Sequence, residues 1–314
     1  MATYTKKLVR GSAIILFMSV FGSFLGFLAR ILLARNLSTT EYGLFYAVFA
    51  FVSFFLFFRD FGLNQALAKF IPGFIIKKEY NKIKTAIVSV FTVQLISTTI
   101  FGVLLYVFSD FLAAHYFKDA AASFILKVFI LYVLFSMAFM LLVSILQGFQ
   151  RIIVYSSAES LRSILMLGMI FFLFTKGLGI AAPTYGFAIS YILVVAIFIP
   201  YFLSIFHFFS YKIVDFKNMT KKLFAFSLPV LLTSIGARAI ARMDTLVLTY
   251  FVSLDQVGIY NVAMPIALLL LFFADAVSSV SLPLISELHA RKDHARIKEW
   301  VRMLYKYSIL ISAP

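Results

Sequence analysis

The chain has 314 residues, of which 63% are hydrophobic and 13% are charged, and its formal net charge is +15. No water-soluble fold of this length could bury so much apolar surface, so the composition excludes a soluble protein and places the chain in a bilayer. It contains no cysteine, its four histidines lack metal-ligand spacing, and no phosphate-binding loop motif occurs, so we expect no metal or other cofactor.

Apolar runs of about 20 residues, each long enough for one helical crossing, follow one another along the chain. A basic N-terminus, residues 1–10, precedes the first run, which we interpret as a retained spanning helix and not as a signal peptide. The expected helices cover residues 11–34, 42–64, 85–108, 124–147, 152–174, 186–209, 223–250 and 257–284, and a ninth begins near Trp300. The predicted fold class is therefore an all-α, polytopic integral membrane protein.

An internal repeat relates the two parts of this helical series. An ungapped shift of 215 positions superposes residues that carry the same side chain in both copies. The matched pairs are Lys6 and Lys221, Lys7 and Lys222, Leu8 and Leu223, Ser12 and Ser227, Ser19 and Ser234, Leu33 and Leu248, Ser38 and Ser253, Gly43 and Gly258, and Asp60 and Asp275. A repeat this long, made of spanning segments, is typical of a transporter built from two homologous lobes.

The repeat also predicts how the lobes are arranged. The first copy, residues 1–215, has an even number of crossings, so both copies enter the membrane from the same side and the two six-helix lobes are parallel. Residues 216–314 form the first part of the C-terminal lobe and stop within an apolar run. We expect a longer protein, because the first copy implies about three more crossings, for about twelve or more helices in all.

Basic residues distinguish the two sides of the membrane. Those in one set of connections are Lys6, Lys7, Arg10, Lys69, Lys77, Lys78, Lys82, Lys84, Arg151, Lys212, Lys217, Lys221, Lys222, Arg291, Lys292, Arg296, Lys298 and Arg302. The opposite connections carry Arg35, Lys118 and Lys176. The positive-inside rule therefore predicts a cytoplasmic N-terminus, and a charge distributed loop by loop argues against nucleic-acid binding.

Cations inside the predicted spans are the main candidates for a binding site. Arg30 lies in the first helix, and Arg238 and Arg242 lie four residues apart in the seventh, within polar stripes that the repeat makes equivalent. Buried ionisable groups usually face a partner or a wet cavity, so we expect a basic cleft between the lobes. Asp244 points away from Arg242 and is expected to pair with another helix. The alternative is that these arginines snorkel and serve packing alone.

Two further charged pairs are candidates for gating or ion coupling. Arg59 and Asp60 end the second helix, and Asp275 is the repeat partner of Asp60. We interpret them as gate salt bridges, with proton or cation coupling as the alternative. Glu159 and Arg162 are three residues apart in the fifth helix, a spacing that predicts a pair on the cytoplasmic rim, with substrate contact as the alternative.

Three stretches carry a resemblance to a known family. They are LARNLSTTEYGLF at residues 33–45, LQGFQR at 146–151 with ESLRS at 159–163, and MDTLVLTYF at 243–251 with VGIYN at 257–261 and LPLISEL at 282–288. Together they resemble the polysaccharide and oligosaccharide (O-antigen type) flippases of the multidrug/oligosaccharidyl-lipid/polysaccharide exporter superfamily. Thr249 stands where this family is expected to have glycine.

The resemblance implies a transporter and not an enzyme. It implies that a polyprenyl-(pyro)phosphate-linked oligosaccharide crosses the plasma membrane by alternating access, with Arg30, Arg238 and Arg242 at the anionic head group and Arg59 as a cytoplasmic capture residue. Membrane lipid and other polysaccharide assembly proteins are the further partners expected. Two alternatives stay open: a cation-coupled multidrug exporter, whose cavity would be acidic or aromatic, and a membrane-embedded enzyme acting on lipid-linked sugars, which would need a larger outer loop.

Overall fold

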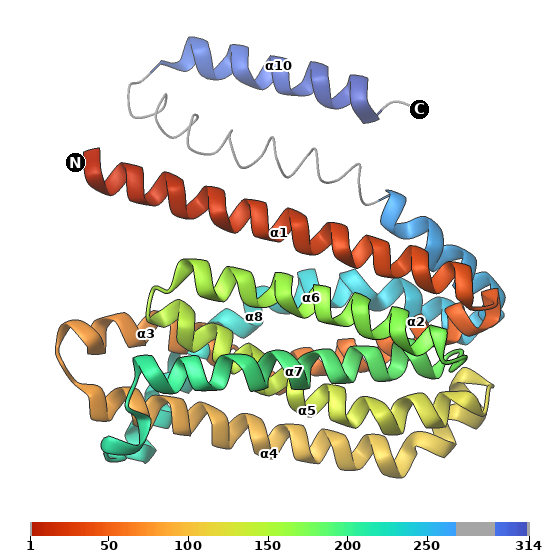
Figure 1. The fold of residues 1–314 in the computed structure, drawn as a ribbon. Coiled ribbons are helices and arrows are strands. Elements are labelled where there is room, and N and C mark those ends of the chain that lie inside the picture. The colour runs from red at the N-terminus through yellow and green to blue at the C-terminus, as the bar shows by residue number, and fades with distance from the viewer. Residues whose placement is uncertain (1, 268–292, 313–314) are drawn as a thin grey trace. The chain divides into compact units, whose positions relative to one another are not determined.

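The computed structural model describes residues 2–267 and 293–312, and every regular element in these ranges is a helix (Figure 1). In chain order the elements are α1 (Ala2–Asn36), α2 (Thr39–Asp60), α3 (Leu63–Ile76), α4 (Tyr80–Leu112), the π-helix η1 (Ala113–Phe117), α5 (Ala121–Gly148), α6 (Ile152–Thr175), α7 (Ala181–Ile205), the 3-10 helix η2 (Phe208–Ser210), α8 (Phe216–Phe251) and α10 (His294–Ser312). A further helix begins at residue 254 and is described to residue 267. The predicted all-α fold class is confirmed.

Six helices within these ranges are long and apolar enough to cross a membrane. The apolar spans are Phe17–Asn36, Thr39–Leu56, Tyr80–Phe117, Ala121–Gly148, Ile152–Thr175 and Ala181–Ile205. They coincide with the first six predicted crossings. α8 contains the seventh predicted helix, residues 223–250, but begins earlier, at Phe216, and residues 268–284 of the eighth predicted helix lie outside the described part of the chain. The chain is therefore a multi-pass membrane protein, as predicted.

The second predicted helix, residues 42–64, extends beyond the observed end of α2. α2 ends at Asp60, and Phe61 and Gly62 take positive φ angles of 49° and 73° before α3 begins. A Cβ atom at Gly62 would lie 2.9 Å from the carbonyl oxygen of Ser227 in α8, so glycine lets α8 approach the break closely. The apolar side chains of α3 that recur at helical spacing are buried: Leu63, Ala66, Leu67, Ile71 and Phe74. Part of the predicted loop after the second helix is therefore α3.

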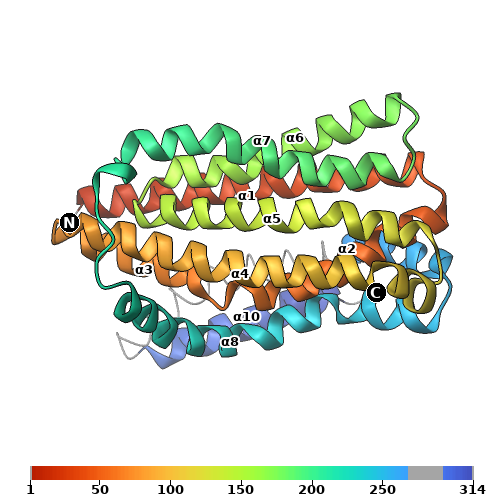
Figure 2. The same cartoon turned by 90° about the horizontal axis from the view of Figure 1, so that it is seen from below.

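The structure forms two compact units, residues 1–259 and 260–314. In the first unit α5 lies in the middle and contacts α2, α3, α4, α6 and α7, and Figure 2 shows it running between α7 and α4. α1 packs mainly along α6, and α8 packs against α2, α3 and α4. α8, which begins the predicted C-terminal lobe, thus completes the packing of the helices that precede it.

Helix boundaries recur with the same shift as the sequence repeat. α1 ends at Asn36 and α8 ends at Phe251, 215 positions later, and α2 and the helix that follows α8 begin at residues 39 and 254. The repeat found in the side chains therefore corresponds to two equivalent helix-turn-helix units.

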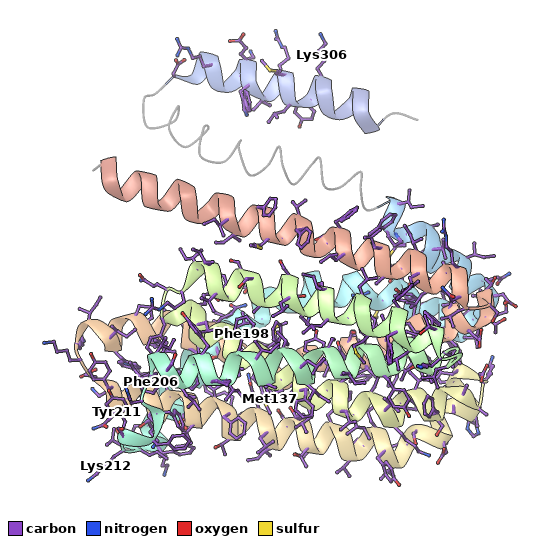
Figure 3. All side chains as sticks on the ribbon, in the orientation of Figure 1. Met137, Phe198, Phe206, Tyr211, Lys212 and Lys306 are labelled. Atoms are coloured by element: carbon purple, nitrogen blue, oxygen red, sulfur yellow. The ribbon has the colours of Figure 1, made fainter. Side chains whose placement is uncertain are left out.

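The connection between α7 and α8 is attached to the start of α4. Lys84 Nζ donates to the carbonyl oxygen of Tyr211 at 2.7 Å, and the backbone amide of Lys212 donates to Asn81 Oδ1 at 3.0 Å. The ring of Tyr211 stacks on Phe206 with 5.0 Å between centroids, and these residues lie together at the end of α7 in Figure 3. The link between the two repeats is therefore bonded to the first repeat.

Candidate functional site

Two cations from different helices lie over neighbouring aromatic rings of α2. The guanidinium carbon of Arg30, in α1, is 4.5 Å from the ring centroid of Tyr46. That of Arg242, in α8, is 5.4 Å from the ring centroid of Phe49. Residues three apart share a face of a helix, so α1 and α8 present their cations to the same face of α2. Each contact has cation–π geometry.

Arg30 and Arg242 are near enough to repel each other electrostatically, while Asp244 attracts Arg242. Asp244 Oδ1 accepts a hydrogen bond from the backbone amide of Thr245 at 2.7 Å. Two cations held close together cost free energy unless negative charge compensates them, and Asp244 supplies one negative charge for the two. The arrangement is therefore suited to an anionic ligand with more than one charged oxygen.

The aromatic surface continues from Phe49 into the centre of the first unit. Its ring centroid is 6.0 Å from that of Tyr132 in α5, which is 5.4 Å from that of Tyr191 in α7. The guanidinium carbon of Arg162, in α6, lies 5.0 Å from the Tyr191 centroid. We call this surface the cation–aromatic strip, and its members are Arg30, Tyr46, Phe49, Arg242, Tyr132, Tyr191, Arg162 and Glu159.

Glu159 and Arg162 form the pair that their spacing predicts. Arg162 Nε donates to Glu159 Oε1 at 3.0 Å, and the same oxygen accepts from Nη2. The Arg162 side chain is 12% exposed and lies over the ring of Tyr191, whereas the side chain of Glu159 is 50% exposed. The pairing is confirmed, and the predicted position on the cytoplasmic rim stays a prediction.

Arg59 is buried at the contact between α2 and α5. Its side chain is 7% exposed, and Nη1 donates to the carbonyl oxygen of Val133 and, at 3.1 Å, to Ser136 Oγ. Hydrogen bonds reduce the cost of burying a charge, and here the bonds of Nη1 join two helices, while Nε is buried without a hydrogen-bond partner among the described residues. In this conformation Arg59 therefore connects α2 to α5, and its predicted role in capturing substrate stays a prediction.

Asp60 connects the α2–α3 break to α4. Its Oδ1 accepts from Gln94 Nε2 at 2.6 Å and from the backbone amide of Asn64 at 3.3 Å. Ser97 Oγ, also in α4, donates to the carbonyl oxygen of Arg59. Polar groups at the end of α2 are thus held by side chains of α4. The gating or coupling role predicted for Asp60 stays a prediction.

Two predicted site residues lie outside what the structure describes. The backbone of Arg238 belongs to α8, but its side chain is not among the described ones, and Asp275 lies outside the described residues altogether. Within the described residues, groups of three or more His, Cys, Asp or Glu side chains that could hold a metal ion are absent.

Sequence reasoning missed the aromatic half of the strip. Tyr46, Phe49, Tyr132 and Tyr191 were not selected as candidates, because the sequence holds 39 phenylalanines and 16 tyrosines and most fill the core or face lipid. One signal could have identified these rings: a cation deep in one membrane-spanning helix needs an interaction partner at the same depth on a neighbouring helix. That signal requires knowing which helices are neighbours.

Comparisons with known proteins agree with this architecture. Residues 8–289 match the family described as "Polysaccharide biosynthesis protein". The chain is 28% identical to an uncharacterized membrane protein of Methanocaldococcus jannaschii, over 99% of the chain and 64% of that protein. It is 25% identical to the probable low-salt glycan biosynthesis flippase Agl15 of Haloferax volcanii, over 98% of the chain and 61% of that protein. The chain thus spans less than two thirds of the length of these relatives.

Proposed function

The chain belongs to the polysaccharide biosynthesis protein family, and from this membership we propose that it is part of a flippase for a lipid-linked oligosaccharide. The cargo is a polyprenyl-(pyro)phosphate-linked oligosaccharide, which moves from the cytoplasmic to the outer face of the plasma membrane by alternating access. The similarity to a protein named as a glycan biosynthesis flippase supports this proposal. The N-terminus is cytoplasmic in this proposal, in accord with the basic connections.

The observation that carries the proposal is the placement of Arg30 and Arg242 over Tyr46 and Phe49. A phosphate or pyrophosphate group offers several charged oxygens, and guanidinium groups bind such oxygens through paired, charge-assisted hydrogen bonds. The lipid tail of the cargo can remain in the bilayer while the head group occupies the polar site. Two arginines from the two repeats can then hold one head group between them.

The alternative functions fit this geometry less well. A cavity for cationic drugs would repel its cargo at Arg30 and Arg242, since like charges at short range are unfavourable. An enzyme acting on lipid-linked sugars would need a catalytic loop on the outer side. The predicted outer connections that the structure describes are residues 37–38, 118–120, 176–180 and 252–253. Connections this short hold too few side chains for a catalytic site.

A leaflet-access assay on the protein made from its complete gene tests the proposal. Liposomes carry a fluorescent polyprenyl-pyrophosphate oligosaccharide on both leaflets, and an impermeant glycosidase added outside cleaves the exposed sugar. In protein-free liposomes we expect cleavage to stop when about half of the labelled lipid has been cut, because the glycosidase cannot reach the inner leaflet. In liposomes that contain the protein we expect nearly all of the labelled lipid to be cut. Equal end points with and without protein would contradict the proposal, and efflux of a cationic dye by the same vesicles would favour the exporter.

Paired variants assign the activity to the two arginines. Arg30→Gln and Arg242→Gln each remove a cation and are expected to slow cleavage of the inner pool. Arg35→Gln is the matched control: Arg35 is exposed, lies at the end of the same helix and lines a groove between α1 and α6. Normal flipping by both strip variants would show that the head group binds elsewhere.

A further inference from the structure

Two glycines meet where α2 and the helix that follows α8 begin. A Cβ atom on Gly43 would lie 1.9 Å from the carbonyl oxygen of Leu254 and 2.8 Å from the amide nitrogen of Gly258. A Cβ atom on Gly258 would lie 2.3 Å from the carbonyl oxygen of Thr39. The obstructing atoms belong to the backbone, so any side chain here would push the two helices apart.

The contact is reciprocal under the repeat. The 215-residue shift relates Thr39 to Leu254 and Gly43 to Gly258, and each glycine meets the first residue of the other helix. Thr40 Oγ1 donates to Asp255 Oδ1, and these two residues are also repeat partners. Mutual contact between equivalent positions is the signature of a two-fold axis. The two repeats therefore touch each other here about a local pseudo-two-fold axis.

At this contact the start of α2 is fixed by a capping box, whereas the hydrogen bond between the two helices is exposed. Ser38 and Glu41 form a capping box that fixes the start of α2: the Ser38 amide donates to Glu41 Oε2 at 2.9 Å, and the Glu41 amide donates to Ser38 Oγ at 3.2 Å. The bond between Thr40 and Asp255 is exposed, so water can replace it when the two helices separate. Such a contact can open without disturbing the helices that form it.

Along α2 the glycine contact lies beyond the two arginines. Tyr46 is one turn from Gly43 and Phe49 is two turns from it, so the contact lies about 5–10 Å nearer the start of the helix. The start of α2 faces outward in the predicted topology. A head group held at Arg30 and Arg242 would have to pass this contact to leave on that side.

We propose that the reciprocal contact of Gly43 and Gly258, with the bond between Thr40 and Asp255, is the outer gate of the transport path. The inference rests on the proposed function. The gate is closed in this structure, and the two repeats separate at this point when the head group leaves. Glycine at both positions lets the gate close, and because the bond across it is exposed, bonds to water can replace it when the gate opens.

A cysteine pair tests the gate. The 314 residues contain no cysteine of their own, and any cysteine in the rest of the complete protein is first replaced by serine. Thr40→Cys and Asp255→Cys are introduced together in the complete protein, and closure is measured as disulfide formation by gel mobility under reducing and oxidising conditions. In the leaflet-access assay we expect normal flipping when the pair is reduced, loss of flipping when it is oxidised, and recovery on reduction. Each single-cysteine variant is the control for oxidation alone.

The outcomes separate the gate from the proposed function. Full flipping by completely oxidised protein would overturn the gate and leave the flippase proposal intact. If the wild-type protein and the reduced cysteine variant both fail to flip lipid, spin labels on the same two cysteines still test the gate. A gate requires two populations of the distance between the two labels in liposomes. One fixed short distance, with and without lipid-linked oligosaccharide, would overturn the gate.

A glycine variant gives an independent readout. Gly43→Ala is expected to hold the two helix starts apart and to shift the spin-label distances toward the open population. Gly26→Ala is the matched control, since an added Cβ there meets nothing within 4 Å. Unchanged distances in folded Gly43→Ala protein would contradict the proposal.

Discussion

The guanidinium group of Arg242 in α8 lies over the ring of Phe49 in α2, with 5.4 Å between its carbon and the ring centroid. Phe49 also packs against Tyr132 of α5 and Phe187 of α7. The ring therefore belongs to the core of the first repeat, while the cation comes from the second. A residue of one repeat thus positions the candidate ligand-binding group of the other.

Replacing Phe49 with leucine tests this positioning. Phe49→Leu keeps an apolar side chain but removes the ring face, so the cation–π contact is lost at a cost of about 0.5–1 kcal/mol. We expect the lipid concentration for half-maximal flipping to rise about 2- to 5-fold with little change in the maximal rate. Phe51→Leu, on the same helix and packed on Tyr116 and Phe117, is the control. Equal effects of both changes would indicate a general packing defect.

Ser136 is predicted to matter more for stability than Arg59, its hydrogen-bonding partner. Ser136→Ala leaves the buried Arg59 guanidinium short of a partner, which is expected to destabilise the protein by about 1–3 kcal/mol. Arg59→Met replaces the buried charge with an apolar chain and is expected to cost less than about 1 kcal/mol. Thermal unfolding of the purified protein in detergent measures both.

The double variant completes this test. Arg59→Met with Ser136→Ala removes both hydrogen-bonding groups, so most of the loss caused by Ser136→Ala alone is expected to be recovered. Additive losses would show that the two side chains stabilise the fold independently. Normal stability of Arg59→Met combined with lost flipping would favour the predicted capture role of Arg59.

The sequence predicted the helices and the repeat because both depend on periodic signals along one chain. Apolar runs marked the crossings, and the pair of Glu159 and Arg162 followed from spacing within a single helix. The α2–α3 break was missed because the predicted second helix was continued through Arg59, Asp60 and Gly62 to residue 64. The close approach of α8 to Gly62 is a tertiary contact, which the sequence of one helix does not show.

The contacts of the candidate site could not be predicted for the same reason, because they also depend on how the helices pack against one another. Helical spacing shows that Arg30 and Arg242 need partners, but the choice of Tyr46 and Phe49 depends on which face of α2 turns toward α1 and α8. For Arg59, the chain position near a helix end suggested a cytoplasmic capture residue or a member of a gate salt bridge. The rotation of α2 instead directs the side chain into α5, and sequence position carries no information about that rotation.

The capping box at the start of α2 is expected to contribute measurable stability. Ser38→Ala removes the side chain that accepts from the Glu41 amide, a loss that typically costs about 1 kcal/mol. Ser38→Thr keeps the hydroxyl group and is expected to restore most of it. Unfolding midpoints in a denaturant titration compare the three proteins, and identical midpoints for Ser38→Ala and wild type would contradict the prediction.

A pair of alanine substitutions is predicted to act in opposite directions on the packing of α3. A Cβ atom on Gly148, at the end of α5, would lie 2.8 Å from the Cβ atom of Ile71, which is fully buried. Because a Cβ atom moves only with its backbone, Gly148→Ala forces α3 and α5 apart and is expected to destabilise the protein by about 1–3 kcal/mol.

Gly73→Ala, on the exposed side of the same short helix, is the matched control. An added Cβ there meets nothing within 4 Å, and alanine restricts the unfolded chain more than glycine, so stability is expected to rise by about 0.5–1 kcal/mol. Thermal unfolding of the two variants beside wild type measures the difference. A stabilising Gly148→Ala would mean that α3 can move away from α5 at little cost, and the close contact of Ile71 with Gly148 would then be unimportant for the fold.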